Sequence, residues 1–314
     1  MKKNAIFSLF FETFFILMCY CIYRALQFYK EFFKIYIEPV NIEKKSTVFP
    51  ILDSFDTISL KELNRLTPLK RFDSKFICHK SDLNYILGSL IDSYCILKIE
   101  DKLVFNYSNV YYDTPMNDFF NSHINGKLGR YKLRKRHYRD TDDVFIEIKY
   151  KNNRGETTKY RFRSLIEYRN PLVEHFDDIS GHLPLIVKKL SPTVNIDYKR
   201  ITLLKPGEFD KITIDFDLRL STTDGGTIRL PNLLILEHKS IIKSGDKAIA
   251  QILKNTNYKK MSLSKYCLGL TLTKPGIKYN LYKPKLLTIN KICNGINTEY
   301  SQFLWNNSFD GISG

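Results

Sequence analysis

Two segments of this sequence place a glutamate and a lysine at alternate positions, Glu147 with Lys149 and Glu237 with Lys239. In an extended strand, alternate residues share one face, so each segment would present a carboxylate beside an ammonium group. A carboxylate can hold a hard divalent cation through its oxygens, and an ammonium group can bind a phosphate oxygen. This spacing therefore favours a site for a metal-bound phosphate.

Charged residues also alternate along other segments that are otherwise apolar. Three sets would each share a strand face: Lys132, Arg134 and Arg136; Lys159, Arg161 and Arg163; and Asp215, Asp217 and Arg219. Any one such run is typical of a solvated outer surface. However, residues 127–163 carry 13 Lys and Arg against five acids, which gives half of the chain's net charge of +16. A charge focused in this way points to an anionic ligand.

The composition of the 314-residue chain excludes several classes of protein. Hydrophobic residues make up 43% of the chain, which is enough for a buried core and excludes a disordered or collagen-like chain. The six cysteines form no C-x-x-C pair and have no zinc-ligand spacing with histidine. We therefore expect free thiols in a reducing compartment rather than a disulfide scaffold.

The spacing of apolar residues predicts many consecutive strands with few helices between them. The predicted strands are residues 71–78, 94–99, 103–112, 130–138, 144–151, 157–163, 194–203, 211–220 and 233–239, and the predicted helices are 57–66, 82–91, 116–122, 171–189 and 245–254. Thr57 is the expected N-cap of the first helix. Residues 275–314 show no clear period. This order favours an α+β fold, with a mainly antiparallel sheet of about eight strands that could close into a barrel.

Residues 4–23 are mostly apolar and long enough to span a bilayer, although Glu12 near their middle is costly there. Three interpretations remain open: a membrane anchor, an apolar helix that docks on the domain, or an extension without a folded role. We therefore divide the chain into an N-terminal segment and connector (1–50), a main domain (51–275) and a C-terminal tail (276–314). The main domain is expected to be cytoplasmic, with residues 4–23 as its candidate membrane anchor.

A series of segments resembles, in order, one known family. The segments are LKRFDSKFIC (69–78), VYYDTPMNDFF (110–120), KLRKRHY (132–138), FIEIKYK (145–151), TTKYRFR (157–163), VNIDYKR (194–200), KITIDFDLRL (211–220), LLILEHKS (233–240) and MSLSKYCLGL (261–270). Together they resemble the polyphosphate polymerase domain of the VTC type, within the CYTH or triphosphate tunnel metalloenzyme superfamily. The resemblance covers roughly residues 55–273.

This resemblance implies an antiparallel β-barrel that forms a charged tunnel, and transfer of the γ-phosphate of ATP onto a polyphosphate chain. It implies phosphate-binding roles for Lys75, Arg134, Arg136, Lys149, Lys159, Arg161, Arg200, Lys211, Lys239 and Lys265. For the divalent cation, Mn²⁺ or Mg²⁺, it implies Glu237 as the principal ligand, with Glu147, Asp215 and Asp217 as further candidates for binding the metal or orienting the lysines. ATP and inorganic polyphosphate would be the partners, and no nucleic acid is expected.

Two departures from the family pattern affect this interpretation. The superfamily's hydrolases typically begin with an E-x-E-x-K strand, whereas this strand reads Arg71-Phe72-Asp73-Ser74-Lys75, which favours a polymerase. Position 211 is a lysine where some members have an arginine, which keeps the charge but loses the bidentate geometry. A CYTH-type tripolyphosphatase and a non-catalytic polyphosphate-binding module remain the alternatives.

Overall fold

A single curved sheet forms the framework of the computed structural model. Its main path runs β2–β11–β9–β8–β4–β5–β6–β7, and every neighbouring pair along this path is antiparallel. The strands of this path are β2 (Phe72–His79), β4 (Phe105–Asp113), β5 (Arg130–Tyr138), β6 (Asp143–Lys151), β7 (Thr157–Ser164), β8 (Ser191–Leu204), β9 (Asp210–Thr222) and β11 (Leu233–Ser240). Three short strands, β1 (Thr57–Ile58), β3 (Cys95–Leu97) and β10 (Thr227–Leu230), pair at its margins. This confirms the predicted antiparallel α+β architecture.

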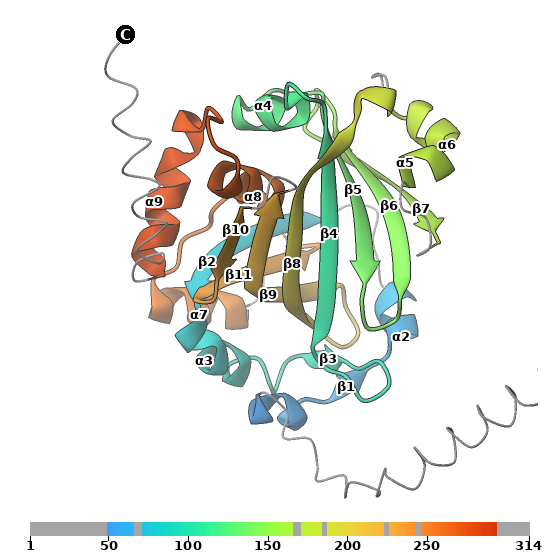
Figure 1. Cartoon of the computed structure of the whole chain (residues 1–314). Helices are drawn as coiled ribbons and strands as arrows, with labels where there is room; N and C mark the ends of the chain where they lie inside the picture. Colours follow the sequence, from blue (N-terminus) through green and yellow to red (C-terminus); the bar gives the residue numbers. More distant parts are fainter. Residues whose placement is uncertain are drawn as a thin grey trace, which may run out of the picture. The chain divides into compact units, whose positions relative to one another are not determined.

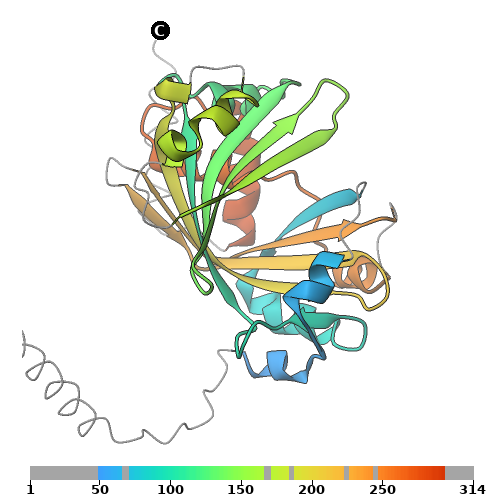
Figure 2. The same cartoon turned by 90° about the vertical axis from the view of Figure 1, so that its right-hand side faces the viewer.

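The sheet bends strongly, so that its two end strands project toward the same side (Figure 2). Among the described residues no hydrogen-bonded ladder joins β2 to β7, so the barrel is open along this seam. Residues paired directly across two strands share a face. We call the face that carries Lys75, Glu237 and Arg200 the inner face and the opposite one the outer face.

Helices cover parts of this sheet (Figure 1). They are α2 (Leu60–Arg65), α3 (Leu83–Gly88), α4 (Asp118–Ile124), α5 (Pro171–Glu174), α6 (Phe176–Ser180), α7 (Lys247–Thr256), α8 (Lys265–Thr273) and α9 (Lys283–Ile292). Helix α8 packs against β8 and β9, and its Gly269 lies beside Val194 and Ile196 on the inner face. It therefore covers the apolar end of that face and leaves the charged part uncovered.

Two of the local predictions were wrong, and one helix lies where none was predicted. Residues 57–58 form a strand, and the next helix is capped by Ser59 rather than Thr57: the Ser59 backbone N–H donates to Glu62 at 2.9 Å and the Glu62 N–H to Ser59 Oγ at 3.3 Å. The helix predicted over 171–189 is two short helices, α5 and α6, and a 3₁₀ helix, η3 (Val187–Lys189). Helix α9 lies in the stretch that showed no period, and it packs against β2.

The structure describes residues 49–65, 71–165, 171–183, 187–222, 226–242 and 247–293, and from Ile51 onward these belong to one compact unit. The apolar segment 4–23 lies outside the described residues. In the described part of the chain no helix is both long and apolar enough to cross a bilayer. Four cysteines lie in the described ranges, and all four are free thiols.

Candidate functional site

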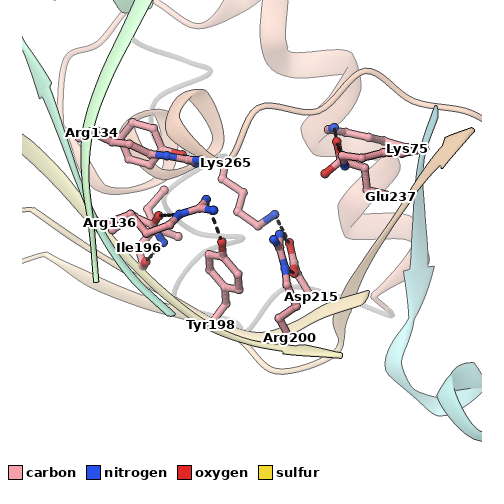
Figure 3. Close-up of polar contacts among 12 residues, drawn as sticks. Lys75, Arg134, Arg136, Ile196, Tyr198, Arg200, Asp215, Glu237 and Lys265 are labelled. Carbon is pink, nitrogen blue, oxygen red and sulfur yellow. Dashed lines mark hydrogen bonds and ion pairs between the residues drawn. The ribbon is translucent and has the colours of Figure 1, made fainter. Parts of the chain in front are cut away.

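The strand register brings most of the predicted site residues onto the inner face. Lys75 lies opposite Glu237, Lys239 opposite Lys211, Arg200 opposite Asp215, Arg134 opposite Glu147, Glu147 opposite Arg161, and Lys149 opposite Lys159. Lys265 reaches the same face from the first turn of α8, and Figure 3 shows it pointing at Asp215. Segments from β2 to α8, far apart in the sequence, thus contribute to one charged surface.

Glu147 is the centre of the first cluster on this face. Its carboxylate is only 2% exposed, yet four cations surround it. Arg134 Nη2 and Lys159 Nζ lie 2.5 and 2.6 Å from its oxygens, and Arg161 Nε and Arg136 Nε lie at 3.6 and 3.8 Å. Burial alone would raise the pKa of Glu147, but Arg134, Arg136 and Lys159 outweigh it and hold that pKa well below its usual range. Glu147 is therefore a permanent counter-ion that orders these cations.

Asp215 organises the second cluster (Figure 3). Arg200 contacts it with two nitrogens, and Lys265 Nζ contacts Oδ2. Burial opposes ionisation, but Arg200 and Lys265 prevail and lower the pKa of Asp215 to about 2. Like Glu147, this buried carboxylate is neutralised by cations that face the interior of the curved sheet.

Glu237 forms the third cluster, with a different geometry. The shortest contacts of Lys75 and Lys239 are both to Oε1, that of Lys239 at 2.6 Å. The neighbouring strand places Thr213 directly opposite Glu237, and the buried Thr213 hydroxyl oxygen has no hydrogen-bond partner among the described residues. The closest lysine contacts thus gather on one oxygen of Glu237, and Oε2 and the Thr213 hydroxyl are the candidate ligands for a cation.

These oxygens fit a hard divalent cation, although they do not form a complete ligand set. In the described residues no three His, Cys, Asp or Glu side chains come together as a metal site. Mg²⁺ in phosphate-transfer sites is commonly held by one or two carboxylates together with substrate phosphates and water. The residues present fit that arrangement, with Glu237 as the protein's carboxylate.

Aromatic rings support the cations between the first two clusters. The rings of Tyr107 and Tyr198 stack with centroids 5.2 Å apart and an interplanar angle of 6°. Arg200 lies 4.9 Å from the Tyr107 centroid and Lys265 lies 4.8 Å from the Tyr198 centroid, both within the range of cation–π attraction. Arg136 also lies 5.4 Å from the Tyr107 centroid and donates to Asn109 at 3.0 Å. The tyrosines and Asn109 fix cations without neutralising them.

A second group of lysines on the inner face has no carboxylate partner in the part of the chain that the structure describes. Lys132 Nζ donates to the Ser264 hydroxyl at 2.9 Å, and neither Lys149 nor Lys211 makes an ion pair with a described residue. Burial, reinforced by neighbouring cations, lowers the pKa of Lys132 and of Lys211 to about 7. These cations are short of negative charge, as expected where an anionic ligand binds.

A cavity of about 310 Å³ opens beside these lysines. It is lined from both end regions of the sheet and from the stretch before α8, by Asp73, Lys75, His123, Arg130, Lys132, Lys149, Lys151, Thr157, Lys260, Met261, Ser262 and Leu263. The cations in this lining outnumber the single carboxylate. Burial, followed by the charge of Lys132, lowers the pKa of His123 to about 2, so this imidazole stays neutral.

The site residues predicted from the sequence did not include several residues that line this cavity. Arg130, Lys132 and Lys151 continue the alternation that identified Arg134 and Lys149, so their spacing could have placed them in the site. Lys260 gave no such signal, because it lies outside the named strands; a bridge to Phe76 holds it beside β2. Tyr198 and Asn109 belong to the site because they contact its arginines. These contacts join different strands, so the sequence alone does not show them.

Asp217 is the predicted site residue that the structure places elsewhere. Its backbone is left-handed, with φ of 52°, and β9 carries one extra residue here relative to β8. This bulge reverses the facing of the residues beyond it, so Arg219 lies opposite Asp197 on the outer face. Asp217 itself pairs with Lys80 and, at 3.2 Å, with Lys199. The expectation that Asp215, Asp217 and Arg219 share one face was wrong.

The segment Ser264-Lys265-Tyr266-Cys267-Leu268-Gly269 at the start of α8 connects the site to the rest of the fold. Ser264 caps α8 by accepting from the Cys267 N–H at 3.3 Å, and Tyr266 donates its hydroxyl to buried Asp113. Asp113 also accepts the backbone N–H groups of Phe119 and Phe120 at 3.0 and 2.9 Å, which fixes the start of α4. These bonds hold α8 so that Lys265 reaches Asp215.

Comparisons with known proteins place the chain in a family. A search of curated proteins found no match. Similar solved structures include a putative adenylate cyclase from Bacillus halodurans, at 12% identity and a TM-score of 0.44, covering 62% of this chain and 94% of that one. Another is a putative adenylyl cyclase from Hippeastrum described as having a dominant triphosphatase activity, at 14% identity and a TM-score of 0.44, covering 68% and 99%. The model of the VTC domain matches residues 70–274, most of the chain. The chain therefore belongs to the VTC domain family.

Proposed function

We propose that this protein is a polyphosphate polymerase that transfers the γ-phosphate of ATP onto a polyphosphate chain at the inner face. Membership of the VTC domain family supports chemistry on phosphate chains. The observation that carries the proposal is the excess of ordered cations there. The buried Glu147 and Asp215 and the partly buried Glu237 are each paired with cations, while Lys132, Lys149 and Lys211 have no carboxylate partner among the described residues. Such a surface suits a ligand with many negative charges in a row.

The arrangement suits phosphoryl transfer, because that reaction depends mainly on positioning and on neutralising charge. Arg134, Arg136 and Arg161 would hold oxygens of the transferring phosphoryl group from one side, and Arg200 and Lys265 from the other. Glu147 and Asp215 hold these cations in place before a ligand arrives, so little reorganisation is needed. Lys132, Lys149 and Lys211 would bind phosphates of the growing chain.

A divalent cation would supply further neutralisation of the triphosphate. Glu237 would hold it through Oε2, with the Thr213 hydroxyl nearby and phosphate oxygens completing its coordination. Lys75 and Lys239, which contact the other oxygen of Glu237, would stay in place and bind phosphate oxygens beside it.

The carboxylates favour a phosphate acceptor over water. Glu147, Asp215 and Glu237 each contact at least two cations, and Asp73 pairs with Arg71 at 3.1 Å. The pKa values of Glu147, Asp215 and Glu237 all lie below the ordinary range, so these carboxylates are weak bases for activating water. A terminal phosphate oxygen is already a nucleophile and needs no such base. This observation favours the polymerase over a tripolyphosphatase.

One assay separates the two reactions. The purified full-length chain is given ATP with Mn²⁺ or Mg²⁺, with and without a short polyphosphate primer, and products are sized on a gel. We expect chain growth and stoichiometric ADP. Orthophosphate without chain growth would identify a hydrolase, and binding of polyphosphate without turnover would identify a binding module. Arg134→Ala is the matched variant and should lose chain growth, whereas Arg154→Ala, on an exposed turn, should retain it.

A further inference from the structure

The bulge in β9 produces a second charged feature, on the outer face of the sheet. Because the extra residue at Asp217 reverses the facing of the residues after it in β9, Arg219 lies outward, opposite Asp197 of β8 on one side. On its other side Arg219 lies directly opposite Arg229 of β10, the strand beside β9 in Figure 1. Two arginines thus occupy one cross-strand position.

This pairing is unfavourable for the protein alone. Like charges directly opposite on neighbouring strands destabilise a sheet. Both arginines are exposed, and neither guanidinium has a hydrogen bond or ion pair with a described residue. Asp197, the one acid opposite Arg219, is instead 3.6 Å from Arg139. The two guanidinium groups are therefore available to an external anion.

The arginines lie in a concave surface, which we call the outer cleft. Its volume is about 530 Å³, and its lining is Asn106, Tyr107, Arg139, Asp140, Asp197, Tyr198, Lys199, Asp217, Leu218, Arg219, Arg229 and Pro231. A space of this size accommodates a short chain of phosphates. Because Arg219 and Arg229 are cross-strand neighbours, their planar forks can bind adjacent phosphate groups in the bidentate manner that arginine favours.

The acids of the outer cleft do not cancel this charge, because partners within the protein already neutralise them. Asp217 contacts Lys80 and Lys199. Asp140 contacts Lys102 Nζ at 2.8 Å and accepts the backbone N–H of Asn106 at 2.5 Å. The pKa values of Asp140 and Asp217 are both lowered, since these donors outweigh the effect of burial. Among the described residues, the unpaired charge in the cleft is thus positive.

We propose that the outer cleft is a second anion-binding site, which takes an inorganic oligophosphate between Arg219 and Arg229. Arg219 lies on the outer face of strands whose inner face carries the three clusters, although the lining of the cleft also includes the inner-face residues Tyr107 and Tyr198. Occupation of the cleft does not depend on whether the inner face polymerises or hydrolyses phosphate chains. A free oligophosphate and a single orthophosphate share the chemistry that the arginines recognise, but only the former can place a separate phosphate group on each arginine.

The test is protection of individual arginines from modification by phenylglyoxal, read by peptide mass spectrometry on the full-length chain. Tripolyphosphate is the probe, orthophosphate is the arm for a single phosphate, and sodium chloride at matched ionic strength is the control for screening. At twice the dissociation constant, tripolyphosphate should slow modification of Arg219 and Arg229 about threefold by mass action. The exposed Arg154 in the same sample should be unaffected.

A second experiment uses a variant and measures the modification of Arg139 by phenylglyoxal. Arg139 lines the same cleft and remains present in the double variant Arg219→Gln/Arg229→Gln. Tripolyphosphate should protect Arg139 in the wild type and in the charge-matched control Arg154→Gln/Lys188→Gln, but not in the double variant. Equal modification of Arg219 and Arg229 with and without tripolyphosphate would overturn the proposal, and so would protection that sodium chloride reproduces. Loss of polymerase activity would leave this result unchanged.

Discussion

Arg200 donates two hydrogen bonds to Asp215, from Nε to Oδ1 at 2.5 Å and from Nη2 to Oδ2 at 2.8 Å. Both carboxylate oxygens are thus engaged by one guanidinium group, and Lys265 adds a third contact. Asp215 is 1% exposed, so it has no water to replace these partners. Asp215 therefore serves to position Arg200 and Lys265, and its oxygens are poorly placed to bind a metal ion as well.

Asp215→Asn should strongly destabilise the protein. The change removes the counter-charge of Arg200 and Lys265 while leaving both cations partly buried. Breaking a buried ion pair from one side costs about 3–5 kcal/mol. Urea unfolding would measure the loss, with Asp142→Asn as the control, because that side chain is 75% exposed and asparagine tolerates its left-handed backbone. A loss as small as that of the control would contradict the role assigned to Asp215.

Glu237→Gln should act mainly on the metal dependence of the reaction. The shortest lysine contacts of Glu237 are both to Oε1, and this carboxylate is the best candidate ligand. We expect the free Mn²⁺ concentration at half-maximal activity to rise about tenfold or more, measured at a fixed concentration of the metal–ATP complex. Glu147→Gln is the comparison: it should lower the unfolding temperature and leave the metal dependence of any residual activity unchanged. If Glu147→Gln raised the required Mn²⁺ concentration and Glu237→Gln did not, the metal would lie at Glu147 instead.

Binding of oligophosphate should take up protons near pH 8. Burial lowers the pKa values of Lys132 and Lys211 to about 7, and that of Lys239 to about 8, so these amines are largely or partly neutral at that pH. A bound polyanion raises their pKa values, because it favours the charged form. Calorimetric titration with tripolyphosphate in two buffers of different ionisation enthalpy measures the uptake. Lys211→Met should reduce the uptake and Lys98→Met, on the exposed surface, should not.

Lys211 should also make the stability of the protein depend on pH. The pKa of Lys211 is about 7 in the folded chain and has a reference value of 10.5, so between these values the unfolded chain binds more protons. Stability attributable to Lys211 therefore rises with pH across this window, and below about pH 7 the full penalty is present. Unfolding of wild type and Lys211→Met at pH 7 and pH 9 tests this. The variant should gain most at pH 7, and an equal effect at both values would refute the shift.

Gly269→Ala should destabilise the protein, although alanine favours helices. A Cβ atom there would lie 3.0 Å from Val194 Cγ2 and 3.1 Å from Ile196 Cδ1, both on the strand beneath α8. Overpacking of this kind costs about 1–3 kcal/mol, which exceeds a helix-propensity gain of about 1 kcal/mol. The control is Gly88→Ala, where the nearest atom would be 3.6 Å away. We expect a lower unfolding temperature for the first variant only.

The sequence alone determined most strands and their alternation, because a strand's period is local. Each of the nine predicted strands overlaps an observed one, and β5 has the predicted bounds. Alternation also placed Arg134 with Arg136 and Glu147 with Lys149, and the register brings both pairs onto the inner face. Local spacing was enough to infer that a charged surface existed and which residues formed most of it.

Only the tertiary structure decided the rest, since those features depend on partners far away in the chain. Helix α8 is buried nearly all round, so it has no amphipathic period to detect. The bulge at Asp217 depends on how β9 pairs with β8, and it moved Asp217 and Arg219 away from Asp215. The partners of each carboxylate and each lysine lie on neighbouring strands. No local period therefore reveals which carboxylates are fully paired with cations or which lysines lack a counter-charge.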